Sequence, residues 1–205
     1  VSGVQVTTAG GQPGAASKIR VRGTGTVNSA DPLYIVDGMP IEGGIDYLNP
    51  SDIQSIEILK DAASGAVYGA RAANGVVLVT TKSGSIGKPV VKYDFSIGWQ
   101  NPWRKRKLLN AAQYTTLMKE AASYQGETNI DNILKGMGNS DTDWQDVLYN
   151  DNAPVQNHQL SISGATEKLN YYLSMGYYKD EGVIGGDYGR SNYERMTIRT
   201  NTTYN

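Results

Sequence analysis

The sequence predicts a small α+β domain followed by a series of long antiparallel β-strands. Two stretches carry this prediction. Between residues 53 and 81 the chain runs through a strand, a short segment of small side chains, a turn and a second strand. From residue 91 onward apolar side chains occupy every second position, and three later segments repeat this alternation over about ten residues each.

Short strands separated by turns are expected before residue 42. The alternation of apolar and polar residues predicts strands at residues 3–8 and 17–22, and two short apolar stretches follow at 33–36 and 39–41. Asp37 and Gly38 form the turn between the last two, because both residue types tolerate turn conformations. The chain begins in mid-pattern, so we expect a signal peptide to lie upstream of Val1.

The stretch at 53–81 predicts a compact unit of strand, helix, turn and strand. Residues 53–59 form the first strand, and the small side chains at 62–68 favour one or two helical turns that stop at Gly69. Asn74 and Gly75 then predict a turn. The β-branched run at 76–81 is typical of a strand that is covered on both faces.

A change of composition at 82–89 predicts a flexible linker, which ends in Pro89. Tyr93, Phe95, Ile97 and Trp99 then alternate with polar residues. Two interpretations fit this pattern. The apolar face belongs either to the core of a soluble sandwich or to the lipid side of an outer-membrane barrel.

Strand length and loop length favour the barrel. Alternating segments at 156–164, 170–179 and 193–204 approach the length of about 9 to 11 residues that crosses a membrane. A short joint at 165–169 contrasts with a long polar one at 180–192. Because long loops of such barrels lie outside the cell, residues 101–154 are expected to form the first extracellular loop.

This loop is expected to contain two helices. Asn110 and Gln113 have the spacing of a capping box, apolar residues follow at helical spacing, and Gly126 ends the helix. A second, shorter helix is expected after Asp143. The cluster of Asp141, Asp143 and Asp146 lacks the glycine and distal glutamate of a calcium loop, so we interpret it as helix capping. The basic run at 104–107 is expected in a solvated loop or against lipid headgroups.

Composition excludes several classes of function. A formal net charge of −1 over 205 residues gives no basic field for nucleic acid. No apolar run reaches the ~20 residues of a transmembrane helix. Without cysteine, and with His158 as the only histidine, thiolate, zinc and Ser/His/Asp chemistry lack their groups. We expect no metal site, no cofactor and no enzyme activity, and we interpret His158 as an ordinary side chain of a strand or pore wall.

The literal sequence resembles the SusC/RagA-type TonB-dependent outer-membrane transporters over nearly its whole length. In the first half the resemblance rests on I-R-V-R-G, P-L-Y-I-V-D-G-M-P-I and the run from N-P-S-D-I-Q-S-I-E-I-L-K-D-A to A-N-G-V-V-L-V-T-T-K. In the second half it rests on G-W-Q-N-P-W, L-N-A-A-Q-Y, D-T-D-W-Q-D-V-L-Y and P-V-Q-N-H-Q-L-S-I-S-G. The resemblance implies an α+β plug domain followed by the first antiparallel strands of a transmembrane β-barrel.

The resemblance also implies domain bounds and site residues. Residues 1–88 correspond to an N-terminally truncated plug, and residues 89–205 to about four barrel strands, with further strands expected beyond Asn205. Arg22 and Lys60 match plug positions that pair with carboxylates of the barrel wall. Tyr93, Phe95, Ile97 and Trp99 would face lipid.

The implied function is TonB-dependent, energy-coupled uptake of an oligosaccharide or oligopeptide across the outer membrane of a Gram-negative cell, with the plug gating the barrel. TonB would act on a segment upstream of Val1, and a SusD-like surface lipoprotein would deliver the cargo. The alternative is a soluble or surface-attached β-rich carbohydrate-binding module, in which the four residues from Tyr93 to Trp99 would be buried by protein. An enzyme would require a pair such as Asp37 and Glu57 to converge in a cleft.

Overall fold

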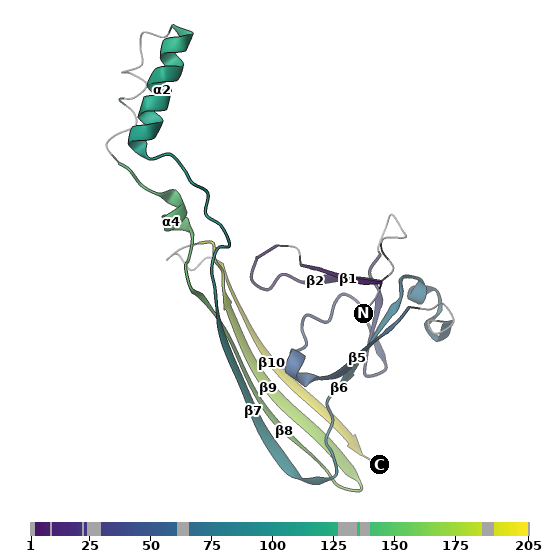
Figure 1. Cartoon of the computed structure of the whole chain (residues 1–205). Coiled ribbons are helices and arrows are strands. Elements are labelled where there is room, and N and C mark those ends of the chain that lie inside the picture. Colours follow the sequence, from purple (N-terminus) through teal and green to yellow (C-terminus); the bar gives the residue numbers. More distant parts are fainter. Residues whose placement is uncertain are drawn as a thin grey trace.

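The strands of the chain form three separate sheets. The computed structural model describes residues 3–8, 10–21, 23, 30–60, 66–126, 135, 140–185 and 191–204. A two-stranded sheet has the order β1-β2, a small sheet has the order β4-β3-β6-β5, and a long sheet has the order β10-β9-β8-β7. Figure 1 shows the small sheet beside the inner side of the curved long sheet, while helix α2 projects beyond one end of the long sheet.

The first sheet is an antiparallel hairpin of β1 (Val4–Thr8) and β2 (Ser17–Val21), as the alternation predicted. Val21 is buried at its end. The side chain of Val21 packs onto Gly75, whose φ is +91°; a Cβ atom at Gly75 would lie 2.9 Å from Cγ1 of Val21. Both the backbone conformation and this close approach therefore require glycine at position 75.

The small sheet contains β3 (Leu33–Val36), β4 (Met39–Ile41), β5 (Ile53–Leu59) and β6 (Val76–Thr81). The bounds of β5 and β6 are those that the sequence predicted. β6 is central, parallel to β3 and antiparallel to β5. Asp37 and Gly38 join β3 to β4 with φ values of +49° and +85°. Positive φ at both positions is the requirement of a tight two-residue hairpin turn, which Asp-Gly satisfies.

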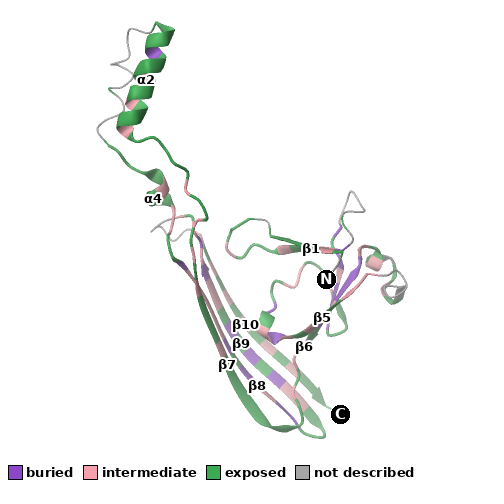
Figure 2. Ribbon diagram, in the orientation of Figure 1, coloured by how far each residue is buried: buried purple, intermediate pink, exposed green. Residues whose placement is uncertain are grey.

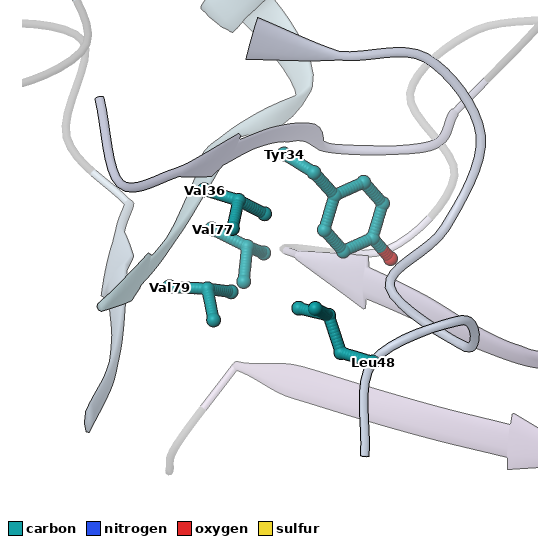
Figure 3. Packing of buried hydrophobic residues seen from close by; sticks show 5 residues of the cluster. All are labelled: Tyr34, Val36, Leu48, Val77 and Val79. Atoms are coloured by element: carbon teal, nitrogen blue, oxygen red, sulfur yellow. The ribbon is translucent and has the colours of Figure 1, made fainter. Parts of the chain in front are cut away.

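The core of the small sheet lies on one of its faces. Tyr34, Val36, Leu48, Val77 and Val79 pack together there (Figure 3). Val76 on the opposite face is also fully buried, so β6 is covered on both sides as predicted. A single turn of 3-10 helix, η1 (Pro50–Asp52), precedes β5 and begins at the capping side chain of Asn49.

The segment between β5 and β6 departs from the prediction. Its described part is the 3-10 helix η2 (Ala66–Asn74), in which Gly69 separates two turns with a φ of +67° and a ψ of −155°. Gly69 thus interrupts the helix, as expected, but the chain continues into a second turn. That second turn closes when the amide of Gly75 donates to the carbonyl of Ala72.

The long sheet is wholly antiparallel. Its strands are β7 (Gly87–Gln100), β8 (Ala153–Ala165), β9 (Leu169–Glu181) and β10 (Asn192–Tyr204). Each strand begins earlier than the alternation predicted, and β7 even includes Pro89. This is possible because the register between β7 and β8 shifts between Gly87 and Val90, where proline interrupts no ladder of hydrogen bonds.

The helices of the loop between β7 and β8 match their predicted caps. In α2 (Ala111–Gln125) Asn110 and Gln113 form a reciprocal capping box, and Gly126 ends the helix with a φ of +70°. The shorter α4 (Trp144–Leu148) is capped by Asp143. Among the described residues, no helix combines the length and the apolar character needed to cross a membrane.

Candidate functional site

The two faces of the long sheet differ in chemistry. The inner face, toward the small sheet, carries polar side chains such as Gln159, Ser161, Ser174 and Arg199, and the first three of these are buried. The outer face carries apolar side chains that remain exposed. Figure 2 shows buried and half-buried positions along the strands beside the small sheet, whereas β7 is mostly exposed. The inner face is therefore a contact surface between the two sheets.

One contact joins the Asp37 turn to β10 through Arg199. Nη2 of Arg199 lies 2.7 Å from Oδ2 of Asp37 and also donates to the hydroxyl of Thr81. Thr81 in turn donates its amide to Oδ1 and its hydroxyl to Oδ2 of Asp37, at 2.8 and 2.6 Å. We call these three residues the Asp37 cluster. It connects the ends of β3 and β6 to the wall formed by the long sheet.

The Asp37 cluster stabilises the charged form of its carboxylate. Burial alone would raise the pKa of Asp37, but the hydrogen bonds from the hydroxyl and amide of Thr81, together with Arg199, outweigh it and hold the pKa below its ordinary value. The arginine side chain is only 18% exposed and the Asp37 side chain 35% exposed. The charged pair is thus partly shielded from water, and the lower effective dielectric strengthens the attraction between Arg199 and Asp37.

A second contact is buried and lacks a charged partner among the described residues. Asp52, at the end of η1, is 3% exposed. Its Oδ1 accepts hydrogen bonds from Nε2 of Gln159 and from the hydroxyl of Tyr172, the latter at 2.7 Å. Two neutral donors therefore satisfy a carboxylate that would be costly to bury alone.

A third contact depends on a glycine in the wall. Nδ2 of Asn49 lies 3.4 Å from Oδ1 of Asn157 on β8. A Cβ atom at Gly176 would lie 2.7 Å from Oγ1 of Thr197 and 3.0 Å from Nδ2 of Asn49. The absence of a side chain at Gly176 thus lets Asn49 approach the wall.

Arg195 provides a fourth contact, from β10 to the loop before η1. Its guanidinium donates to the backbone carbonyl of Asp46 and lies 5.6 Å from the centre of the Tyr178 ring. A pocket of about 510 Å³ opens next to this contact, between Tyr47, Leu48 and Asp52 on one side and β10 on the other. No cluster of three His, Cys, Asp or Glu side chains forms a metal site within the described ranges.

The segment expected as a flexible linker is held in place. The amide of Gly84 donates to Oδ1 of Asn170 at 2.8 Å, and Nδ2 of Asn170 donates back to the carbonyl of Gly84 at 2.9 Å. The amide of Lys82 also donates to the carbonyl of Asp52. Gly84 packs directly against the backbone carbonyls of Gly164 and Tyr171. Specific backbone contacts thus override the flexibility that the Gly-Ser composition indicates.

The outer face is a continuous apolar surface. Tyr93, Phe95, Ile97 and Trp99 on β7 are 61%, 52%, 45% and 62% exposed. Their cross-strand neighbours continue the surface over the other strands, and the exposed members are Leu160, Leu173, Met175, Tyr177, Met196 and Ile198. His158 also lies on this face, with its Nδ1 2.8 Å from the hydroxyl of Tyr93. An exposed apolar surface of this extent is a contact surface for lipid or protein.

The predicted contact residues of the plug are only partly placed. Arg22 lies outside the described residues. Lys60 is half-buried at the end of β5, and its pairing with a wall carboxylate stays a prediction. Glu57 lies on β5, on the other side of β6 from Asp37, and Asp37 is engaged by Thr81 and Arg199.

Sequence reasoning missed the residues that make the contacts between the sheets. It expected basic residues of the plug to meet acids of the wall, whereas Asp37 meets an arginine of the wall and Asp52 meets neutral donors there. One signal was available, since Arg195 and Arg199 both fall on the polar face of an alternating strand. The capping interpretation holds for two of the three aspartates, since Asp143 caps α4 and Asp141 accepts from the amide of Ala111 at the start of α2. Asp146 instead forms an ion pair with Lys105.

Comparison with known proteins identifies the relatives of this chain. Residues 1–76 match the family profile described as TonB-dependent Receptor Plug Domain. The TonB-dependent receptor SusC of Bacteroides thetaiotaomicron is 33% identical over 98% of this chain, and a TonB-dependent receptor of Formosa agariphila is 40% identical over 98% of it. Among solved structures, the RagAB peptide importer in its closed-closed state matches all of the chain with a TM-score of 0.85 and 30% identity.

The chain is much shorter than these relatives. It spans 20% of the length of each of the two receptors and 26% of the matched chain of the RagAB structure. The match to the RagAB structure includes both the small sheet and the long sheet, since all residues of this chain are covered. The fold is therefore a plug domain followed by antiparallel strands of the kind found in these receptors.

Proposed function

This chain belongs to the SusC/RagA-type TonB-dependent receptors, and from this membership we propose that it takes part in energy-coupled uptake of a large nutrient across the outer membrane. The small sheet acts as the plug and the long sheet as part of the barrel wall. The observation that carries the proposal is the set of polar contacts from Asp37, Asn49 and Asp52 to the wall. A gate needs contacts that hold and also break reversibly, and hydrogen bonds worth about 1 kcal/mol each do both.

We assign the plug to residues 1–88 and the wall strands to residues 89–205, with the loop 101–154 on the extracellular side. The turn between β8 and β9 then faces the periplasm, where turns of such barrels are short. Tyr93, Phe95, Ile97 and Trp99 face lipid in this arrangement, and their exposure supports it.

We also assign Arg22 and Lys60 to contacts between the plug and wall carboxylates. The half-buried position of Lys60 supports this assignment, because a charge withdrawn from water needs a partner. Exchange of Lys60 for glutamine should loosen the plug in the full-length receptor, measured as faster hydrogen exchange of β5. Unchanged exchange would remove Lys60 from the set of plug contacts.

The proposed partners follow from the family. TonB pulls on a segment upstream of this chain, and a SusD-like surface lipoprotein delivers the cargo. RagAB is described as a peptide importer, so the cargo class is an oligopeptide or, alternatively, an oligosaccharide. No bond chemistry and no cofactor belong to this role, and the matched relatives are described as receptors.

The gating role is tested by locking the plug to the wall. Asn49→Cys and Asn157→Cys are introduced together in the full-length receptor, and a short reducible crosslinker joins the two thiols. The cells then grow on a tryptic casein digest or on a starch hydrolysate as the nutrient under test. We expect growth on the transported nutrient to stop after crosslinking and to resume after reduction.

A second crosslinked pair controls for damage to the wall. Lys179 and Glu194 are cross-strand partners on the outer face of β9 and β10, so Lys179→Cys with Glu194→Cys joins wall to wall and leaves the plug free. Transport that continues with the plug locked would refute gating. A receptor whose gel mobility does not change on boiling would refute the outer-membrane barrel itself.

A further inference from the structure

The loop that follows β7 carries aromatic and basic side chains next to one another. Residues 103–107 read Trp-Arg-Lys-Arg-Lys, and we call them the basic segment. Trp103 is 96% exposed. Arg104, Arg106 and Lys107 are exposed as well, whereas Lys105 is half-buried. This arrangement presents three cations and an indole ring on one short stretch of chain.

The basic segment is held in a defined position by α4 and the residues after it. Nζ of Lys105 lies 3.0 Å from Oδ1 of Asp146 and 3.0 Å from Oδ2 of Asp151. The amide of Arg106 donates to Oε1 of Gln145 at 2.8 Å, and its carbonyl accepts from Nε2 of the same side chain at 2.6 Å. These bonds fix the backbone, so the neighbouring side chains are presented at low entropic cost.

The other three cations are available to a partner. Among the residues that the structure describes, the side chains of Arg104, Arg106 and Lys107 form no ion pair, in contrast to Lys105. A cluster of like charges without internal neutralisation attracts anions. The segment therefore separates into one cation that anchors it and three that remain free to bind.

The position of the basic segment indicates what that anion is. Trp99 ends the outer-face pattern of β7, and Trp103 follows four positions later. The outer face from Val91 to Trp99 covers about nine residues, or roughly 30 Å along the strand, which with the usual tilt accounts for an apolar band of about 25 Å. The basic segment thus begins where the apolar band ends, at the depth where indole rings and cations meet headgroups.

We propose that the basic segment binds the phosphate groups of lipid in the outer leaflet, with Trp103 at the level of the headgroups and Arg104, Arg106 and Lys107 as the cations. The proposal rests on the proposed function, because it requires the outer face to lie in the membrane. Arginine suits this ligand, since its planar guanidinium forms paired hydrogen bonds with phosphate. The basic segment thereby fixes the depth at which the strands of the long sheet lie in the membrane.

The test measures lipid binding by the full-length receptor in detergent. Native mass spectrometry follows the binding of bis-phosphorylated lipid A to the delipidated protein, and the same lipid without its phosphates is the comparison. The variant carries R104Q, R106Q and K107Q. Each cation near the surface contributes about fivefold in affinity, so we expect lipid A to bind roughly 100-fold more weakly to the triple variant.

A matched variant removes three charges elsewhere. Lys18, Lys119 and Lys168 are exposed and lie outside the basic segment, so K18Q with K119Q and K168Q should leave lipid binding unchanged. Equal binding by the basic-segment variant and the original protein would overturn the proposal. Equal binding of the dephosphorylated lipid, or displacement of lipid A by millimolar inorganic phosphate, would overturn the assignment of a lipid phosphate.

The two proposals fail in different ways. If the outer-membrane function is wrong, the receptor shows no change of gel mobility on boiling. If only the lipid site is wrong, mobility changes on boiling in the original protein and in both variants, while lipid binding is the same in all three. The mobility change also verifies that the variants fold.

Discussion

Arg199 on β10 of the wall binds the ends of two strands of the plug sheet, β3 and β6. It contacts Asp37, which follows β3, and Thr81, which ends β6. Both acceptors lie more than one hundred residues earlier in the chain. Because the pair is partly buried, removal of either partner leaves the other charge poorly hydrated and without an opposite charge beside it.

The lowered pKa of Asp37 makes the contact sensitive to acid. The contribution of the carboxylate to stability is complete above the ordinary aspartate pKa of about 3.9, and it is lost as the pH falls through the lower pKa of the folded chain. We expect Asp37→Asn to lower the free energy of unfolding of the plug by a constant amount from neutral pH down to about pH 5. The difference should shrink toward pH 3, measured by urea titration of hydrogen exchange in β6.

Glu167→Gln is the control for this titration, because Glu167 is exposed in the turn between β8 and β9. We expect Glu167→Gln to leave the free energy of unfolding of the plug unchanged at every pH. If the cost of Asp37→Asn instead grew as the pH fell, the sign of the pKa shift would be wrong.

A substitution at Gly176 tests how closely Asn49 of the plug approaches the wall. Gly176→Ala places a Cβ atom 2.7 Å from Oγ1 of Thr197 and 3.0 Å from Nδ2 of Asn49, so Asn49 must move and its bond to Asn157 is lost. We expect a cost of about 1–3 kcal/mol in the free energy of unfolding of the plug. Gly98→Ala is the matched control, since nothing lies within 4 Å of a Cβ atom at Gly98, and a similar cost for both changes would contradict the close approach.

At the residue scale, local roles were predictable and distant partners were not. Asp37 was correctly placed in a turn, and Asn110 and Asp143 were correctly identified as helix caps, because these roles depend on neighbours in sequence. The partner of Asp37 lies 162 positions away. A single sequence contains no information on which distant arginine meets which aspartate.

The outer face of the long sheet is the element whose environment is most easily tested. Phe95→Lys puts a charge on the apolar face of β7, where a lipid environment imposes a cost of about 2–4 kcal/mol near the middle of the bilayer. Ser96→Lys places the same charge on the opposite face of the same strand. We expect Phe95→Lys to reduce the fraction of receptor whose gel mobility changes on boiling, and Ser96→Lys to leave it nearly unchanged.

Equal effects of the two lysines would mean that the outer face of β7 is not in lipid. In the alternative of a soluble binding module, neither the original protein nor either variant would give a band whose mobility changes on boiling. The fraction that shifts on boiling therefore distinguishes the two environments of Tyr93, Phe95, Ile97 and Trp99.

Most elements followed from periodicity, and the exceptions have physical causes. β5 and β6 kept their predicted bounds because charged or turn residues flank them. The start of β7 was missed because Pro89 suggested an interruption, whereas a strand tolerates proline where its register shifts. The second turn of η2 was missed because Gly69 was taken as an end, although small residues continue after it.

At the scale of the whole molecule, the plug sheet depends on the wall for part of its burial. Among the described residues its core cluster contains five buried side chains, and Asp52 is buried while it is bonded to Gln159 and Tyr172 of the wall. We expect residues 1–88, produced alone, to lack the cooperative unfolding transition of a stable domain, since domains with small cores are marginal. Heat-capacity measurements and near-ultraviolet circular dichroism test this, and a sharp transition with fixed aromatic signals would contradict it.

The overall fold was predictable mainly through the resemblance of the literal sequence to one family. Alternation at residues 91–99 left a sandwich and a barrel equally open, since both place apolar side chains on one face. The curvature of the long sheet and the placement of the plug on its inner side involve residues far apart in sequence. The periodicity of one sequence does not specify such long-range arrangements.

The two hydrogen bonds between Gly84 and Asn170 have a mechanical consequence. They fasten the last part of the plug segment to the end of the β8–β9 hairpin, on backbone that leaves Gly84 no room for a side chain. In the gating that we propose, a pull that broke the contacts of Asp37, Asn49 and Asp52 but spared these two bonds would leave Gly84 as the pivot. The plug would then rotate about this point, and the torque of a pull would grow with its distance from Gly84.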